Sequence, residues 1–207
     1  MPRILMRIFS GYTWHFHTVK EKEIFLTFDD GPTPEVTPFV LAELKKHQAK
    51  ATFFCIGKNI EKHPEIYNTI IAEGHSIGNH TQNHLKGWKS NNTKYIDDFL
   101  ACEKTITQFN KSKIKQKIFR PPYGKIKKSQ AKEILKKGYK IIMWDVLSGD
   151  FDIKLSKEKC LQNVLQNTQK GSIIVFHDSV KAAERMQYTL PKVLNTFSKK
   201  GFSFKPI

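Results

Sequence analysis

Residues Ile24-Phe25-Leu26-Thr27-Phe28-Asp29-Asp30-Gly31-Pro32 join a short apolar strand directly to a polar turn. The strand is apolar along most of its length, as expected of a parallel strand that is covered on both faces. Gly31 and Pro32 then favour a tight turn that exposes the two carboxylates. In parallel α/β folds, functional sites form at the carboxyl ends of the strands. This stretch therefore indicates an α/β fold with a site where its first strand ends.

Short β-rich runs alternate with helical patterns along the rest of the chain. Strands are expected at residues 24–28, 51–55, 76–79, 117–120, 140–144, 172–176 and 201–204. Helices are expected at residues 34–47, 61–73, 93–110, 129–137, 156–168 and 185–200. The alternation predicts a parallel α/β domain, and seven strands favour a distorted (β/α) barrel over the eight-fold form. An open doubly wound sheet is the structural alternative. No Gly-x-Gly-x-x-Gly follows a strand, so dinucleotide binding has no support.

Composition favours one globular domain. The chain has 207 residues, of which 39% are hydrophobic and 15 are Phe, and no repeat or composition break divides it. We therefore expect a single domain over residues 1–207, with residues 1–22 as a short N-terminal extension. No apolar run approaches the roughly 18 residues that a membrane helix needs. The three cysteines are far apart and form neither a C-x-x-C pair nor a disulfide framework.

The first nine residues make a poor secretory signal. They alternate basic and apolar residues and lack both a long apolar run and a small-residue cleavage site. The sequence therefore leaves a cytoplasmic and a cell-envelope location open, and it does not fix the oligomeric state.

The chain is strongly basic, with a formal net charge of +16 from 35 basic and 19 acidic residues. The excess is concentrated between Lys111 and Lys140, where 12 Lys and Arg face one acid, Glu133. A surplus of this size suggests an anionic partner, and a solvated lysine surface is the alternative. Nucleic acid is not expected, because base and phosphate recognition favours Arg and only four of the 35 basic residues are Arg.

Ionisable residues follow five of the expected strands. Asp29 and Asp30 end the first; their charges repel, so the pair needs cations or a metal nearby. His80 and His84 follow the third strand at a spacing that places both imidazoles on one face of a helical turn. Two imidazoles and one carboxylate would make three metal ligands and leave an open position, which is typical of catalytic rather than structural sites. A solvated turn and incidental histidines are the structural alternatives.

Two further strand ends carry candidate catalytic groups. In Arg120-Pro121-Pro122-Tyr123-Gly124 the prolines stiffen the turn, so Arg120 would point inward, where it could hold a carboxylate bidentately. The Tyr123 backbone N–H would remain free to donate. His177 ends the sixth strand and is a candidate for proton transfer; an acidic partner such as Asp150 would raise its pKa and fix its tautomer. A core histidine is the alternative.

Taken together, these motifs resemble the polysaccharide deacetylases of carbohydrate esterase family four, the NodB-homology family. The resemblance covers the chain from about residue 24 to residue 204 and includes five motifs in the family's order: 27–32, 80–84, 120–124, 144–151 and 175–177. It implies a distorted (β/α) barrel with about seven strands. Two positions depart from the family pattern: Phe151 stands where Trp is usual, and Val175 where Leu is usual. Both would be apolar pocket walls, so they affect the fit of the sugar more than the chemistry.

The resemblance also implies a role for each site residue. Asp29 would be the catalytic base, which Arg120 orients and keeps ionised. The metal ligands would be Asp30, His80 and His84, and the Tyr123 N–H would bind the oxyanion. His177 would be the general acid, supported by Asp150. The implied cofactor is one divalent metal ion, zinc first, with cobalt, nickel or manganese as alternatives.

The implied reaction is hydrolysis of an acetamide on an N-acetylated glycan, either peptidoglycan or a chitin-type polymer. One rival is hydrolysis of another amide or ester, such as O-acetylated xylan or a cyclic ureide. The other is a non-enzymatic basic module that binds an anionic polymer. Lys125, Lys127 and Lys128 are expected near the mouth of the site, and Lys111–Lys117 at the opposite end of the fourth strand. A positive mouth would favour a glycan that carries negative charge.

Overall fold

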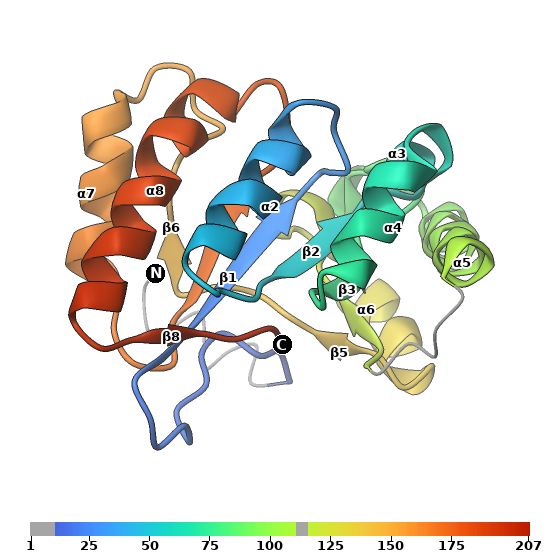
Figure 1. Cartoon of the computed structure of the whole chain (residues 1–207). Coiled ribbons are helices and arrows are strands. Elements are labelled where there is room, and N and C mark those ends of the chain that lie inside the picture. The colour runs from blue at the N-terminus through green and yellow to red at the C-terminus, as the bar shows by residue number, and fades with distance from the viewer. Residues whose placement is uncertain (1–10, 111–115) are drawn as a thin grey trace.

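Short apolar strands form the centre of the molecule (Figure 1). The computed structural model describes residues 11–110 and 116–207, so Lys111, Lys113 and Lys115 lie outside the described residues. The strands are β1 (Glu23–Asp29), β2 (Thr52–Cys55), β3 (Ser76–Asn79), β4 (Ile118–Phe119), β5 (Lys140–Ile141), β6 (Val146–Leu147), β7 (Ile173–His177) and β8 (Ser203–Phe204).

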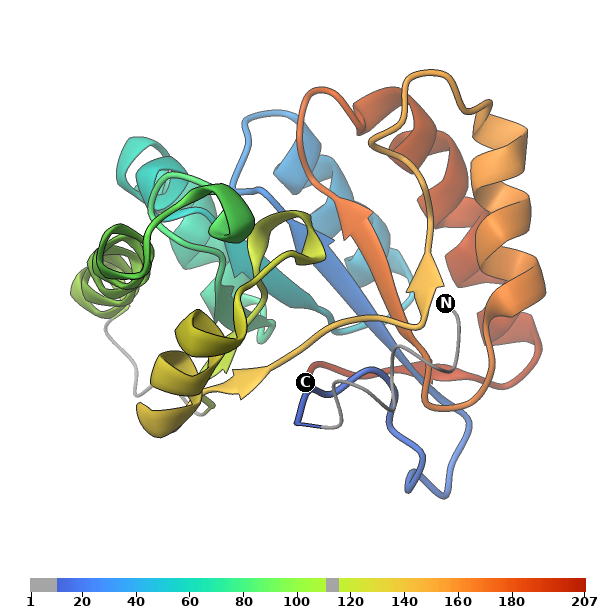
Figure 2. The ribbon, with the colours of Figure 1, turned by 180° about the vertical axis from the view of Figure 1, so that it is seen from behind.

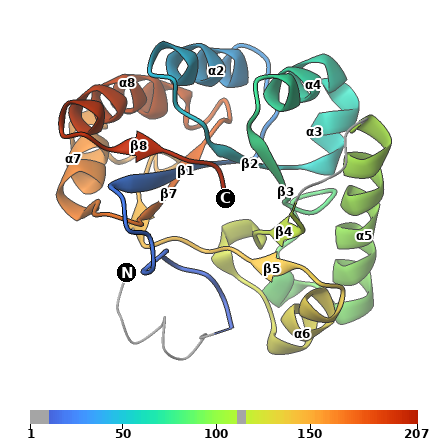
Figure 3. The same ribbon diagram turned by 60° about the horizontal axis from the view of Figure 1, so that its bottom comes forward.

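The strands pair in parallel in the order β5-β4-β3-β2-β1-β7-β6, and β8 adds to the start of β1. The sheet curls so far that only residues 142–145 connect its two edge strands, β5 and β6. Figure 3 shows the strands curved around a common centre with helices outside them. The prediction of a distorted barrel with about seven parallel strands is confirmed, in the form of a curled half-barrel.

Helices cover the outer face of the sheet. They are α2 (Val36–Lys46), α3 (Gly57–Lys62), α4 (Pro64–Ala72), α5 (Asn92–Phe109), α6 (Lys128–Lys136), α7 (Lys157–Asn167) and α8 (Ala183–Lys199), with 3-10 turns η1 (Gly87–Lys89) and η2 (Pro122–Gly124). The expected helix at 61–73 corresponds to α4 and the last two residues of α3, because Pro64 begins a new helix after His63; the first four residues of α3 were not predicted to be helical. The two-residue strand β6 was not predicted.

Strand alternation separates two apolar cores and directs the functional residues inward. On β1, Leu26 and Phe28 pack in the core beneath the helices, together with Leu190 of α8. Phe25 belongs to a second core, which is enclosed by the curled sheet. Because successive side chains of a strand point to opposite faces, Asp29 lies on the same face as Phe25. The register of β1 against β7 pairs Asp29 with His177, so both reach the carboxyl end of the barrel interior.

Part of the N-terminal extension contacts the sheet. Thr13 exchanges backbone hydrogen bonds with Ile141 and Met143, at 2.8 and 2.7 Å, and Phe16 donates to Gly171 at 2.9 Å. Trp14, between them, is buried in the inner core. This segment therefore connects the β5 edge to the residues that precede β7, on the side where Figure 3 shows no helix. Among the described residues, no helix combines the length and apolar character needed to cross a membrane.

Candidate metal centre and acid–base site

Six of the eight predicted site residues line one cavity of about 540 Å³ at the carboxyl ends of the strands, and the other two, Arg120 and Asp150, are fully buried and contact Asp29 and His177. Figure 2 shows the loops that follow the strands gathered at this end of the sheet. Side chains from β1, β7 and the loops after β3 and β4 line the cavity, among them Asp29, Asp30, His80, His84, Tyr123 and His177. The two apolar walls expected from the sequence, Phe151 and Val175, also line it.

Asp30, His80 and His84 form a cluster with the composition of a metal site. Oδ1 of Asp30 lies 3.6 Å from Nε2 of His80 and 3.2 Å from Nε2 of His84, and one ligand atom of each residue lies within 4.8 Å of the others. This buried Oδ1 accepts no hydrogen bond. A buried carboxylate oxygen without a donor, facing two imidazole nitrogens, fits a divalent cation held by mixed N and O ligands.

Protonation of the cluster also suits a cation. Nδ1 of His80 donates to the Arg120 carbonyl at 2.7 Å, so Nε2 keeps its lone pair. Burial lowers the pKa of His80 to about 4, despite the nearby charge of Asp29. Burial alone would raise the pKa of Asp30, but the His84 imidazole and the charge of His177 hold it well below its ordinary value. The neutral imidazole of His80 and the ionised carboxylate of Asp30 are the forms that ligate a metal.

Two of the candidate metal ligands have strained backbone conformations. Asp30 has φ 85° and His84 has φ 56°, a left-handed region that is costly for residues other than glycine. The Asp30 turn is held from outside by Asp178, whose Oδ1 accepts from the Gly31 N–H at 3.0 Å and whose Oδ2 accepts from the Thr37 hydroxyl at 2.6 Å. A Cβ on Gly31 would clash with the Asp178 carboxylate, so this turn requires glycine.

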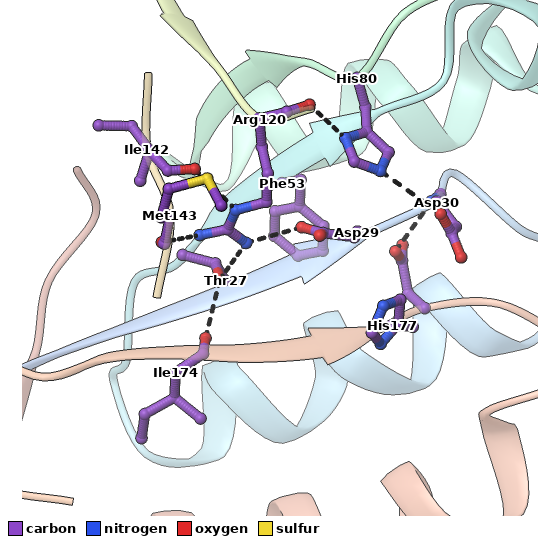
Figure 4. Close-up of polar contacts among 12 residues, drawn as sticks. Thr27, Asp29, Asp30, Phe53, His80, Arg120, Ile142, Met143, Ile174 and His177 are labelled. Atoms are coloured by element: carbon purple, nitrogen blue, oxygen red, sulfur yellow. Dashed lines mark hydrogen bonds and ion pairs between the residues drawn. The ribbon is translucent and has the colours of Figure 1, made fainter. Parts of the chain in front are cut away.

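Arg120 is fully buried and fixes Asp29 (Figure 4). Its Nη1 donates to Oδ1 of Asp29 at 2.7 Å and to the Thr27 hydroxyl at 2.6 Å. Its Nε and Nη2 donate to the carbonyls of Ile142 and Met143 at 3.1 and 2.8 Å. The expected bidentate grip on the carboxylate is therefore wrong. Nη1 alone donates to Asp29, because Nε and Nη2 donate to main-chain carbonyls.

His177 is paired with a buried carboxylate. Its Nδ1 lies 2.7 Å from Oδ1 of Asp150, and its backbone N–H donates to Oδ2 of Asp150 at 2.7 Å. Arg185 in turn donates to the Asp150 carbonyl at 2.8 Å. Burial alone would lower the pKa of His177, but the Asp150 charge outweighs it and raises the pKa to about 9. His177 is therefore an imidazolium near neutral pH, with Nδ1 committed to Asp150 and a proton on Nε2.

Tyr123 stands at the mouth of the cavity in the η2 turn, with φ 61°. Its side chain is 51% exposed, and its ring lies 4.6 Å from the ring of His84. As the second residue of a single 3-10 turn, its backbone N–H has no acceptor within that turn. Tyr123 thus belongs to a loop stiffened by two prolines, and its ring contacts one of the candidate metal ligands.

Sequence reasoning missed several groups that hold this site. Thr27 stands out in the sequence only as part of a motif, although strand alternation on β1 places it beside Asp29. Asp178 directly follows His177, but that position by itself indicates no role. Asp98 of α5 carries no local signal of a role. Its carboxylate accepts from the backbone N–H of Asn83 at 3.1 Å and from the Asn83 side chain at 2.6 Å. Asn83 belongs to the turn between His80 and His84, so Asp98 holds that turn.

Comparison with known proteins points to one family. The profile of the family described as polysaccharide deacetylase matches residues 17–142. A peptidoglycan-N-acetylglucosamine deacetylase of Bacillus cereus is 34% identical over 197 residues, covering 94% of this chain and 91% of the relative. A chitooligosaccharide deacetylase of Azorhizobium caulinodans is 30% identical over 204 residues, covering 92% of this chain and 95% of the relative.

A solved structure shares the whole fold. The crystal structure of a peptidoglycan N-acetylglucosamine deacetylase, in complex with 4-naphthalen-1-yl-N-oxidanyl-benzamide, superposes with a TM-score of 0.89. It is 33% identical, and the match covers 100% of this chain and 95% of that one. Profile, relatives and fold agree, and the chain belongs to the polysaccharide deacetylase family.

Proposed function

We propose that this protein is a metal-dependent hydrolase that removes N-acetyl groups from an N-acetylglucosamine-containing polysaccharide. One observation carries the proposal: a carboxylate held by a buried arginine and an imidazolium held by a buried carboxylate face the same cavity as the Asp30–His80–His84 cluster. Acid and base therefore start in opposite protonation states within reach of one substrate, as hydrolysis of an amide requires.

We propose that Asp30, His80 and His84 hold one divalent ion, zinc before cobalt, nickel or manganese, because two nitrogens and one oxygen suit zinc. When bound, such an ion would polarise the acetamide carbonyl and make a water molecule easier to deprotonate. His80 is buried and Asp30 and His84 are partly buried, and partial burial strengthens the interaction between their charges and an ion.

Proton transfers fall to two residues. Asp29 accepts the proton of the attacking water, and the single contact from Arg120 leaves its second oxygen free of that arginine. His177 then donates its Nε2 proton to the leaving amine, so that the C–N bond breaks rather than the new C–O bond. The Tyr123 N–H stabilises the developing oxyanion, a contribution of roughly 3–4 kcal/mol for a well-placed donor.

The substrate that we propose is peptidoglycan, with a chitin-type oligomer as the alternative. The names of the B. cereus and A. caulinodans relatives support this substrate class. Charge at the mouth favours an anionic glycan, because Lys125 and Lys181 line the cavity. The acidic residues that line it, Asp29 and Asp30, are the proposed base and a proposed metal ligand. Lys127, also expected near the mouth, donates instead to the Ser90 carbonyl at 2.7 Å.

Acetate release measured over a panel of glycans tests the proposal. Peptidoglycan, N-acetylglucosamine oligomers and O-acetylated xylan are compared, each with metal-depleted and zinc-reloaded protein. We expect metal-dependent release from N-acetylated substrates. Release from xylan alone would favour the esterase alternative, and glycan binding without release under every condition would favour the non-enzymatic module.

A further inference from the structure

Asp150 holds His177 but itself lies outside the strands. Backbone pairing between β6 and β7 ends at Ser148, whose N–H donates to the Val175 carbonyl at 3.3 Å. Asp150 lies beyond that point, in the loop that leads to α7, and both of its carboxylate oxygens contact His177. The orientation of this carboxylate therefore depends on what fixes the main chain of Asp150.

A buried arginine fixes that main chain. Arg185 lies in the first turn of α8. Its Nε donates to the Asp150 carbonyl at 2.8 Å, and its Nη2 donates to the Lys181 carbonyl at 2.7 Å. These carbonyls belong to the loops that follow β6 and β7, and Phe151 and Lys181 of the same loops line the cavity. The guanidinium thus joins the two loops that flank the acid.

The charge of Arg185 gains little from its surroundings. Burial of a charged side chain destabilises a fold unless the charge is well paired. The ion pair that the described residues give Arg185 is a loose one, in which Nη1 lies 3.6 Å from Oε2 of the exposed Glu184. An apolar side chain of similar length would fill the space without burying a charge. It would not donate two hydrogen bonds in fixed directions, which the planar guanidinium supplies.

We propose that Arg185 is a positioning residue for the general acid, because its two hydrogen bonds set the distance and angle at which Asp150 meets the His177 imidazole. This inference rests on the proposed function for the catalytic role of His177. A displacement of about 1 Å near the reacting groups lowers a rate by a factor of about a hundred. A loosened Asp150 should therefore reduce turnover and leave substrate binding nearly unchanged.

Nuclear magnetic resonance tests the positioning without depending on catalysis. A strongly hydrogen-bonded imidazole N–H gives a proton signal far downfield, and loss of that signal in His177→Gln assigns it to Nδ1–H of His177. Zinc-reloaded protein is used, because zinc has no unpaired electrons. Arg185→Met removes the donors and keeps most of the side-chain bulk, so the signal should broaden or move upfield. Arg185→Lys retains one donor and should recover part of the wild-type signal.

Turnover supplies a second readout. In Arg185→Met, kcat for acetate release should fall about ten- to a hundredfold while KM stays within about twofold, and Arg185→Lys should recover part of the loss. Glu184→Gln is the control for the loose ion pair. Leu190→Ala, which removes a core side chain of the same helix, is the control for lost stability. Both controls should keep the wild-type signal and kcat.

Thermal melts establish that each variant is folded. A wild-type signal and kcat in folded Arg185→Met would overturn the positioning role, and so would an equal loss in Leu190→Ala. If Arg185→Met does not fold, Arg185→Lys decides by the same signal, because it loses one of the two contacts. Absence of the downfield signal from wild-type protein would contradict the Asp150–His177 contact and the proposal with it. Absence of acetate release would instead contradict the proposed function, and the resonance would still decide the role of Arg185.

Discussion

Replacing Asp150 by Asn should move the alkaline limit of activity. Asp150 contacts both the imidazole and the backbone N–H of His177, and its charge raises the pKa of His177 to about 9 against the burial that lowers it. Asn keeps the shape and a carbonyl oxygen for Nδ1–H but removes the charge. The pKa of His177 should then fall toward its ordinary 6.5, because burial still lowers it while only the weaker effects of the Asp29 and Asp30 charges remain to raise it.

The size of the effect follows from the protonated fraction. At pH 8, a pKa of about 9 leaves about nine tenths of His177 protonated, and a pKa of 6.5 leaves about 3%, a loss of about thirtyfold in available acid. At pH 5.5 His177 is almost fully protonated in both proteins, so the variant should retain most of its activity there. The defect should therefore grow about tenfold with each pH unit above 6.5, until the wild type also loses its proton.

The assay is kcat/KM for acetate release between pH 5 and 10 at saturating metal. Asp152→Asn is the control, because this exposed carboxylate of the same loop accepts only from the Lys154 backbone N–H among the described contacts. Its alkaline limit should match that of the wild type. A uniform loss at every pH in Asp150→Asn, with the limit unmoved, would refute the assignment of that limit to His177.

Further outcomes follow from the same contacts. His80→Ala should abolish binding of one divalent ion, measured by elemental analysis of untagged protein; full occupancy would contradict the ligand assignment. Asp29→Asn should keep the metal and lose at least about a hundredfold in kcat, and loss of the metal instead would make Asp29 a ligand. Asp178→Ala should weaken metal binding about ten- to a hundredfold, because it removes the contacts that hold the ligand turn; unchanged affinity in a chelator competition would exclude that role. The raised pKa of His177 should stabilise the metal-free fold by about 3 kcal/mol below pH 6.5, and denaturant titrations should show this stability lost as the pH rises through about 9, a loss that is absent in Asp150→Asn.

Local pattern predicted most of the framework, because burial on both faces makes strands short and apolar and because polar residues follow strand ends. The turn after β1 and the spacing of His80 and His84 were enough to identify the ligand candidates. The pattern failed where local signals are weak. The two-residue strand β6 carries no periodicity, and the break at His63 and Pro64 lies within one continuous helical pattern.

By itself, the sequence determined which residue types stand at the strand ends, and therefore which chemistry the site can perform. Only the tertiary structure decided how those groups are held. Arg120 divides its donors between Asp29 and two main-chain carbonyls, and Asp178 reaches Gly31 across 147 positions of the chain. The Asp178 contact depends on the strand order that sets β7 beside β1, and the Arg120 contacts depend on the curl of the sheet, because β3 and β2 lie between β4 and β1 in the strand order. A linear pattern records the spacing of neighbours within one element, whereas strand pairing sets the distance between elements that are remote in the chain.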